Sequence, residues 1–157
     1  MKEDETFCYK RFDVKKWDKK KVTWKNKLFV KDTVLAFFHI PLNFGSVVKS
    51  NMKKLKDANA IPKDSMILSD EKSMFYSNLY ITTKKAIPKA KDVRVSGTFL
   101  TKVFEGPYKN IGKWIKEMEE YVKLEKKELK QMYFYYPYCP KCAKKYGNNY
   151  IVIFAEI

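Results

Sequence analysis

The pentapeptide Phe104-Glu105-Gly106-Pro107-Tyr108 joins a segment that alternates like a β-strand, residues 98–105, to one with the apolar spacing of a helix, residues 111–122. Gly106 tolerates a tight turn that a residue with a Cβ would strain, and Pro107 has the fixed φ and the missing N–H that suit the first turn of a helix. Two strand-like segments follow, at 132–138 and 150–157. This stretch therefore predicts the order strand, helix, strand, strand.

The first half of the chain predicts the same order. Residues 34–40 form a continuous apolar run that ends at Pro41, and Val48, Met52 and Leu55 then recur at helical spacing. A helix is predicted to start from the turn at 43–46 and to end near residues 57–59. Two strands are predicted after it, at 65–68 and 74–83, with a turn at 69–72 between them.

The two halves predict an α+β fold, in which tandem strand-helix-strand-strand repeats form one curved antiparallel sheet with two helices on one face. With 157 residues, the chain fits a single domain. Its expected parts are a basic N-terminal segment (residues 1–27), a first repeat (28–85), a connector (86–95) and a second repeat (96–157).

The formal net charge of +15 is typical of proteins that meet nucleic acid or an anionic membrane. Yet only Arg11 and Arg94 among the 33 basic residues are arginines, and recognition of bases and phosphates favours the planar arginine side chain. The charge therefore indicates solvated lysines more than a nucleic-acid interface. In residues 1–31 single aromatics alternate with charges, which predicts either a polybasic tail or, preferably, rings that pack onto the body of the protein.

The charged N-terminus is not followed by an apolar run of signal-peptide length, and no segment approaches the roughly 20 apolar residues of a spanning helix. We therefore expect a cytoplasmic protein without a membrane partner. The three cysteines, with Cys8 isolated from the other two, do not form a disulfide framework.

Side-chain alternation predicts two different faces on the strands. In residues 150–157, Ile151, Ile153 and Ala155 share the side that suits packing under a helix, while Glu156 shares the other side with aromatic residues. Rings at this density would make an unusually large exposed patch, so a cleft for a bulky hydrophobic or aromatic molecule explains them better than a half-solvated sheet surface. The candidate ligand-binding residues are His39, Tyr76, Tyr80, Tyr108, Trp114, Tyr133, Tyr135, Tyr150 and Phe154. For Trp114 a core position is the favoured alternative.

Catalytic and metal-binding candidates are few. His39 is the only histidine, and its apolar surroundings favour a core or pocket-edge imidazole over a general base. Glu105 and Glu156 could each neutralise a cationic ligand or activate a water molecule. Cys139 and Cys142 have the spacing of a metal knuckle or a redox pair, but an ordinary loop is favoured because a zinc site wants four ligands. No cofactor is expected.

The tandem repeat and the sequence Val103-Phe104-Glu105-Gly106-Pro107-Tyr108 resemble the GyrI-like (gyrase-inhibitor-like) superfamily, whose fold also serves as the effector-binding domain of AraC-type regulators. Ser96-Gly97-Thr98-Phe99 and the string from Cys139 to Gly147 look like a group of small bacterial proteins labelled hydrolase. The resemblance covers about residues 28–157. It implies a pocket between the repeats that accepts bulky, often aromatic and cationic compounds.

Some members of the superfamily are sensors, and some are hydrolases that open strained cyclopropane rings. The acidic residue that such regulators commonly carry in the penultimate strand has no counterpart in residues 131–136. We therefore expect a stand-alone small-molecule-binding protein, monomeric or homodimeric, with an aromatic-lined cleft between its repeats. The alternatives are a hydrolase of such compounds in the same cleft, with Glu105 or Glu156 holding a water, and a basic module for nucleic acid or acidic protein.

Overall fold

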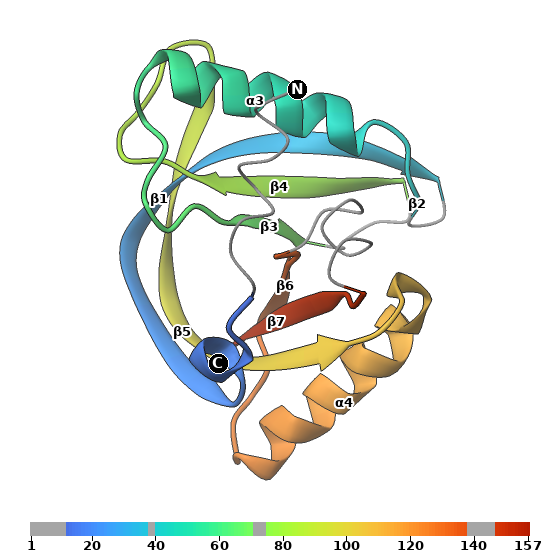
Figure 1. Ribbon diagram of the computed structural model, residues 1–157. Coiled ribbons are helices and arrows are strands. Elements are labelled where there is room, and N and C mark those ends of the chain that lie inside the picture. Colours follow the sequence, from blue (N-terminus) through green and yellow to red (C-terminus); the bar gives the residue numbers. More distant parts are fainter. Residues whose placement is uncertain (1–11, 38–39, 71–74, 138–146) are drawn as a thin grey trace. The chain divides into compact units, whose positions relative to one another are not determined.

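The computed structural model describes residues 12–37, 40–70, 75–137 and 147–157 (Figure 1). The chain divides into two compact units: unit 1 comprises Met1–Val22 and Thr98–Ile157, and unit 2 comprises Thr23–Gly97. Two long strands, β1 (Lys20–Phe37) and β5 (Lys91–Glu105), contribute residues to both units.

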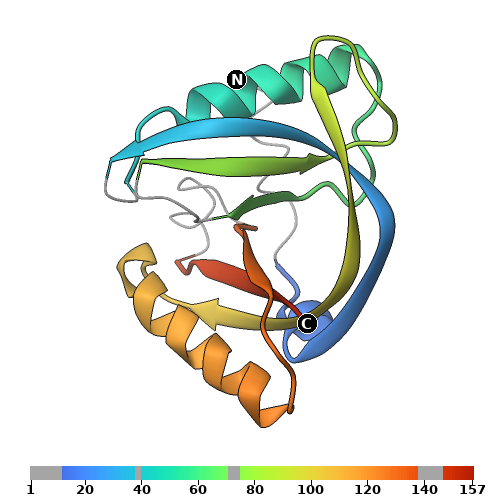
Figure 2. The same ribbon diagram turned by 180° about the vertical axis from the view of Figure 1, so that it is seen from behind.

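Unit 2 contains the larger part of β1, the strand β2 (Ile40–Pro41), the helix α3 (Phe44–Asp57), and the strands β3 (Ile67–Asp70) and β4 (Tyr76–Thr82). Within this unit β4 is antiparallel to β1 on one side and to β3 on the other, so that Ile81 is opposite both Val30 and Ile67. Figure 1 shows α3 running along β1 and β4, and Figure 2 shows the same arrangement from behind.

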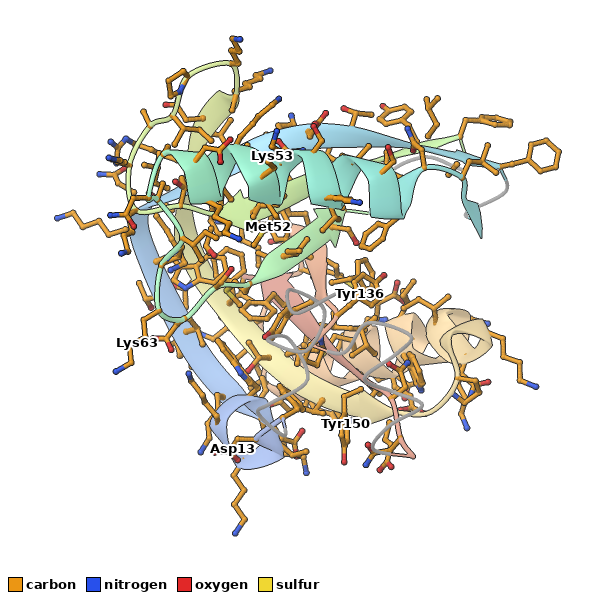
Figure 3. The ribbon with its side chains drawn as sticks, turned by 45° about the horizontal axis from the view of Figure 1, so that its top comes forward. Asp13, Met52, Lys53, Lys63, Tyr136 and Tyr150 are labelled. Carbon is orange, nitrogen blue, oxygen red and sulfur yellow. The ribbon has the colours of Figure 1, made fainter. Side chains whose placement is uncertain are left out.

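The core of unit 2 lies between α3 and the strands. Leu55 of α3 is fully buried with Val30 and Ile81, and Met52 packs against the same cluster. In Figure 3, Met52 is on the side of α3 toward the strands and Lys53 is on the side away from them. Burial of a side chain as large as leucine stabilises the fold by about 1.5–3 kcal/mol. The apolar stripe of α3 therefore determines which side of this helix faces the strands.

Unit 1 contains the four-residue helix α2 (Val14–Trp17), the C-terminal part of β5, the 3₁₀ turn η2 (Tyr108–Asn110), the helix α4 (Ile111–Leu124), and the strands β6 (Gln131–Tyr135) and β7 (Tyr150–Glu156). β7 is antiparallel to β5 on one side and to β6 on the other, so that Thr101, Phe154 and Tyr133 form one row across three strands. α4 lies beside β5 and β7 in both views of the ribbon (Figures 1 and 2).

The core of unit 1 lies between α4 and these strands. Met118 and Val122 of α4 are buried against Phe134 of β6. The residues of β7 that the alternation predicts to pack under a helix all belong to this core: Ile151, Ile153 and Ala155. The prediction of a helix-covered aliphatic face on β7 is confirmed.

Gly106 forms the turn from β5 toward α4 with a φ of +140°, in the region that glycine alone adopts readily. A Cβ at this position would lie 3.3 Å from Cζ2 of Trp114. Pro107 precedes the 3₁₀ turn η2, whose last residue, Asn110, donates its amide N–H to the Pro107 oxygen at 3.0 Å. The α-helix therefore begins at Ile111, the first residue of the predicted helical pattern, and Pro107 lies before the 3₁₀ turn instead of in the first α-helical turn.

Two strands are much longer than predicted. β1 begins at Lys20 rather than at residue 34, and β5 begins at Lys91, inside the segment predicted to be a connector. In both segments charged or polar side chains alternate with half-buried ones, so the local hydrophobicity is too low to indicate a strand, and pairing with neighbouring strands decides the structure. Ser69 and Asp70 lie in β3, where the sequence predicts a turn.

The α+β class and the twice-repeated order of strand, helix, strand, strand are confirmed. Each unit contributes one 14-residue helix and antiparallel strands to that order.

Candidate functional site

Aromatic side chains gather on the face of the unit 1 strands that points away from α4. Phe154 is fully buried, with its ring centroid 6.3 Å from that of Phe99, and Phe99 is in turn 6.0 Å from Tyr133. Both contacts are edge-to-face, the geometry that the ring quadrupoles favour. We call this surface the ring face, and it consists of Phe99, Tyr133, Tyr135, Tyr150 and Phe154.

Two rings from the N-terminal segment cover the ring face. Trp17, the last residue of α2, lies 5.3 Å from Phe154 and 6.0 Å from Tyr135, between ring centroids. Phe12 lies 5.3 Å from Tyr150 and 6.4 Å from Tyr135. Of the two interpretations of residues 1–31, the packing of rings onto the body of the protein is confirmed for Phe12 and Trp17. Sequence analysis did not place either residue in the site.

Hydrogen bonds to β5 hold this N-terminal segment in place. The buried hydroxyl of Thr101 donates to the main-chain oxygen of Trp17 and also lies 3.3 Å from that of Lys20. The amide nitrogen of Val103 donates to Oδ1 of Asp18 at 3.2 Å. We call residues 12–18 the strap, because the side chain at one end, Phe12, contacts the ring face and the side chain at the other end, Asp18, binds β5.

Polar groups lie at the edge of the ring face. Nε2 of Gln131 donates to the hydroxyl of Tyr133 at 2.7 Å, and Nδ2 of Asn148 donates to the hydroxyl of Tyr150 at 2.9 Å. Oδ1 of Asn148 is buried and has no hydrogen-bond partner among the residues that the structure describes. A buried acceptor without a partner is costly, so an N–H or O–H group of a bound molecule would be favoured there.

The two candidate catalytic carboxylates lie on neighbouring strands: Glu156 ends β7, and Glu105 ends β5, opposite the first residue of β7. Glu156 is partly exposed and is opposite Phe99 and Gln131 in the strand register, whereas Glu105 is exposed and opposite Tyr150. Six residues of strand at about 3.3 Å each separate these positions by roughly 20 Å. The two glutamates therefore do not form an acid–base pair at one reacting atom.

Trp114 lies in the core beneath α4, on the opposite side of the strands from the ring face. Its ring stacks on that of Phe104, with centroids 5.8 Å apart and an interplanar angle of 25°. The residue is buried with the apolar stripe of α4. Trp114 therefore lies in the core, the alternative that the sequence favoured over a place in the ligand-binding cleft.

Tyr80 lies on the face of the unit 2 strands that points away from α3, beside a buried carboxylate. Its hydroxyl donates to Oδ2 of Asp70 at 2.9 Å, and the amide N and Nδ2 of Asn78 donate to the same carboxylate at 3.2 Å. Asp70 is only 1% exposed, and the ring of Phe29 meets that of Tyr80 edge-on at 6.2 Å. Sequence analysis missed Asp70 because residues 69–72 have turn composition.

The far end of this unit 2 face is apolar and exposed. Leu35 is 58% exposed and is the register partner of Tyr76, which is 44% exposed. Leu42 lies next to them, since its amide N–H donates to the Leu35 oxygen at 2.9 Å. The exposed large hydrophobic residues of the described chain are Leu35, Phe37, Leu42, Phe75 and Tyr76 in unit 2, and Leu124 in unit 1.

A separate hollow of about 630 Å³ lies against α4 in unit 1, and its lining is mostly charged: Lys19, Lys102, Glu117, Glu120, Tyr121, Leu124 and Glu125. Burial first, and then the carboxylates of Glu125 and Asp18, raise the pKa of Tyr121 above its ordinary value. Nζ of Lys102 lies 5.8 Å from the centre of the Tyr121 ring. Such a lining does not suit a bulky apolar molecule.

Some predicted site residues lie outside the described part of the chain: His39, Cys139 and Cys142. The side chain of Tyr108 is also outside it, although its backbone begins η2. Within the described ranges, His, Cys, Asp and Glu side chains do not gather in groups of three that could hold a metal ion. The described helices include none that is both long enough and apolar enough to cross a membrane.

A family model described as bacterial hydrolase matches residues 1–157. The chain belongs to the bacterial hydrolase family. A comparison with curated proteins found no match for this family member.

Several solved structures share its fold at low sequence identity. SAV2435, solved bound to tetraphenylphosphonium, is 13% identical with a TM-score of 0.52, over 87% of this chain and 92% of that one. Two structures of a hydrolase from Listeria innocua, one described as encoded by lin2189, are each 10% identical, with TM-scores of 0.59 and 0.60, over 99% of this chain and 96% of theirs. At these identities the likeness shows the fold alone.

Proposed function

We propose that this chain binds bulky hydrophobic or aromatic small molecules on the ring face of unit 1. The observation that carries the proposal is that the ring face already holds two rings, those of Phe12 and Trp17, from a segment distant in sequence. A surface that packs separate aromatic rings has the shape and the edge-to-face partners for a ligand of the same chemistry. Each such ring contact contributes about 0.5–1.5 kcal/mol beyond the burial of area.

The comparisons support this class of ligand. Tetraphenylphosphonium, which SAV2435 holds, is bulky and carries four aromatic rings, and SAV2435 shares the fold of this chain. The repeated strand-helix-strand-strand order and this shared fold also support membership of the GyrI-like superfamily. The cytoplasmic location and the absence of a nucleic-acid partner stay predictions.

Calorimetric titration with two probes tests the proposal: tetraphenylphosphonium and the neutral triphenylphosphine oxide. We expect both to bind the wild-type protein. Tyr135→Ala and Tyr150→Ala should each weaken binding about three- to tenfold, which corresponds to the loss of one ring contact.

Tyr121→Ala is the matched control, because Tyr121 is a partly buried tyrosine of unit 1 that lies on α4. It should leave the affinity for both probes unchanged. Equal losses in all three variants, or no binding of either probe to the wild type, would show that the ring face is not the site.

Hydrolysis on the same face is the second candidate function, favoured by membership of the bacterial hydrolase family and by the position of Glu156 at the edge of the ring face. In this case a glutamate holds a water molecule that attacks an electrophilic carbon of the bound compound. Incubation with an aromatic compound that carries a strained cyclopropane should then give a ring-opened, hydroxylated product. Glu156→Gln should abolish its formation, and Glu119→Gln, on the exposed side of α4, should not. Glu105→Gln tests in the same way whether Glu105, the other predicted carboxylate, holds the water molecule.

A further inference from the structure

We infer that the strap, residues 12–18, covers the ring face reversibly. A ligand binds to the ring face by displacing the side chains of Phe12 and Trp17. This inference rests on the proposed function, since it concerns the regulation of the same surface. It adds a mechanism by which the free protein keeps its aromatic surface covered and opens it only for a molecule that replaces both rings.

The strap is much less buried than the surface that it covers. The surface beneath the strap is part of the folded interior: Phe154 and Thr101 are fully buried and Tyr133 is 5% exposed. In the strap, by contrast, α2 is only four residues long and none of its residues is buried. Segments with little buried surface open at low free-energy cost while the core stays folded. The strap can therefore leave without disrupting the strands that it covers.

Ring contacts and hydrogen bonds among the described residues attach the strap to the strands. Its rings contribute contacts at 5.3–6.4 Å to Tyr135, Tyr150 and Phe154. Two hydrogen bonds also join the strap to β5: the Thr101 hydroxyl donates to the Trp17 oxygen, and the Val103 amide N–H donates to the Asp18 carboxylate. A ligand with two rings can replace the ring contacts of the strap. When the strap leaves, its hydrogen bonds to the strands are replaced by hydrogen bonds to water.

The geometry also defines the ligand class. Tyr135 contacts both rings of the strap, Trp17 also contacts Phe154, and Phe12 also contacts Tyr150. A replacing molecule must therefore place two aryl groups near Tyr135 at the same time, one against Phe154 and one against Tyr150. Compact diaryl and triaryl compounds meet this requirement, and a compound with a single ring does not.

Two variants loosen the strap and leave the ring face unchanged. They distinguish a strap that the ligand displaces from a strap that forms a permanent wall of the site. Asp18→Ala removes the acceptor for Val103, and Trp17→Ala removes a competing ring. If the strap competes with the ligand, a larger open fraction raises the apparent affinity. We expect each variant to bind triphenylphosphine oxide about fivefold more tightly than wild type, the effect of one hydrogen bond or ring contact on the opening equilibrium.

Asp64→Ala is the control for charge, because Asp64 is an exposed aspartate of unit 2; it should leave the affinity unchanged. A single-ring probe, phenol, should bind all of these proteins weakly and without the fivefold gain. Weaker or unchanged binding in Asp18→Ala and Trp17→Ala, with Tyr150→Ala still impaired, overturns the strap as a competitor and leaves the proposed function standing. No binding to any variant overturns both.

Limited proteolysis gives an independent readout in the full-length wild-type chain. Trypsin cleavage after Lys15 or Lys16 reports opening of α2, and product masses identify these sites. Displacement predicts that saturating triphenylphosphine oxide accelerates this cleavage several-fold, because the ligand holds the strap off the strands. A wall would instead be protected by the ligand, and slower cleavage would contradict the inference.

Discussion

The rings of Trp17 and Phe154 lie 5.3 Å apart at an interplanar angle of 52°, and they join the N-terminal segment to the last strand of unit 1. Phe154 is fully buried in that strand, while Trp17 belongs to a four-residue helix without buried residues. The contact therefore connects a firmly packed surface to a weakly held segment. This asymmetry underlies both the proposed site and its covering by the strap.

The same asymmetry predicts unequal effects on stability. Phe154→Ala should lower the free energy of unfolding by about 3–5 kcal/mol, because it leaves a cavity in a packed interior. Trp17→Ala should cost about 1–2 kcal/mol, since mainly ring contacts on a partly exposed segment are lost. Urea denaturation followed by circular dichroism measures both values. Leu124→Ala, at a residue 79% exposed, is the control and should change little; equal losses in the first two variants would contradict the asymmetry.

Gly106 should be intolerant of a side chain, in contrast to a second glycine nearby. Gly106→Ala forces a Cβ into a backbone with φ +140° and to within 3.3 Å of the Trp114 ring, so we expect a loss of about 1–3 kcal/mol. Gly112→Ala meets open space inside α4 and should stabilise by about 0.5–1 kcal/mol. Thermal and urea unfolding of the pair test the opposite signs. A neutral Gly106→Ala would show that the turn is not under this constraint.

The carboxylate of Asp70 should depend on its tyrosine partner. Tyr80→Phe keeps the ring but removes the hydroxyl that donates to Oδ2, and hydrogen bonds to charged groups contribute about 1.5–3 kcal/mol. The free energy of unfolding should fall by that amount. Tyr76→Phe is the matched control, because Tyr76 lies on the same strand and is exposed. The prediction fails if the two tyrosine variants lose equal stability.

Tyr121 should ionise at a higher pH than a free tyrosine. Burial first, and then Glu125 and Asp18, raise its pKa above the ordinary value of 10.0. The folded protein therefore retains this phenol proton longer than the unfolded chain does. The resulting stabilisation is present below pH 10.0 and is lost as pH rises through the raised pKa.

Ultraviolet difference titration of wild type against Tyr121→Phe isolates the ionisation of this residue. We expect its midpoint above that of a free tyrosine, and Asp18→Ala should move the midpoint down. A midpoint at or below the ordinary value would exclude the proposed influence of burial and of the two carboxylates.

Local patterns predicted the parts of the fold in which a single element buries a continuous apolar stripe. Met52 and Leu55 of α3, like Met118 and Val122 of α4, recur at helical spacing because each helix packs one side against strands. The alternation of β7 likewise separated its helix-covered residues from the ring face. The polar N-terminal ends of β1 and β5 carry no such signal, because a partly solvated strand is stabilised by its neighbours.

The sequence by itself determined the α+β class, the repeated order of elements, the turn at Gly106, and which residues of β7 point away from the helix. These follow from residue-level physics: side-chain periodicity, backbone freedom and apolar burial. Only the tertiary structure decided that Phe12 and Trp17 cover the ring face, that Asp70 is a buried carboxylate beside Tyr80, and that Glu105 and Glu156 lie far apart on the neighbouring strands β5 and β7. These relationships join residues far apart in the chain, and strand register and packing set them rather than any local pattern.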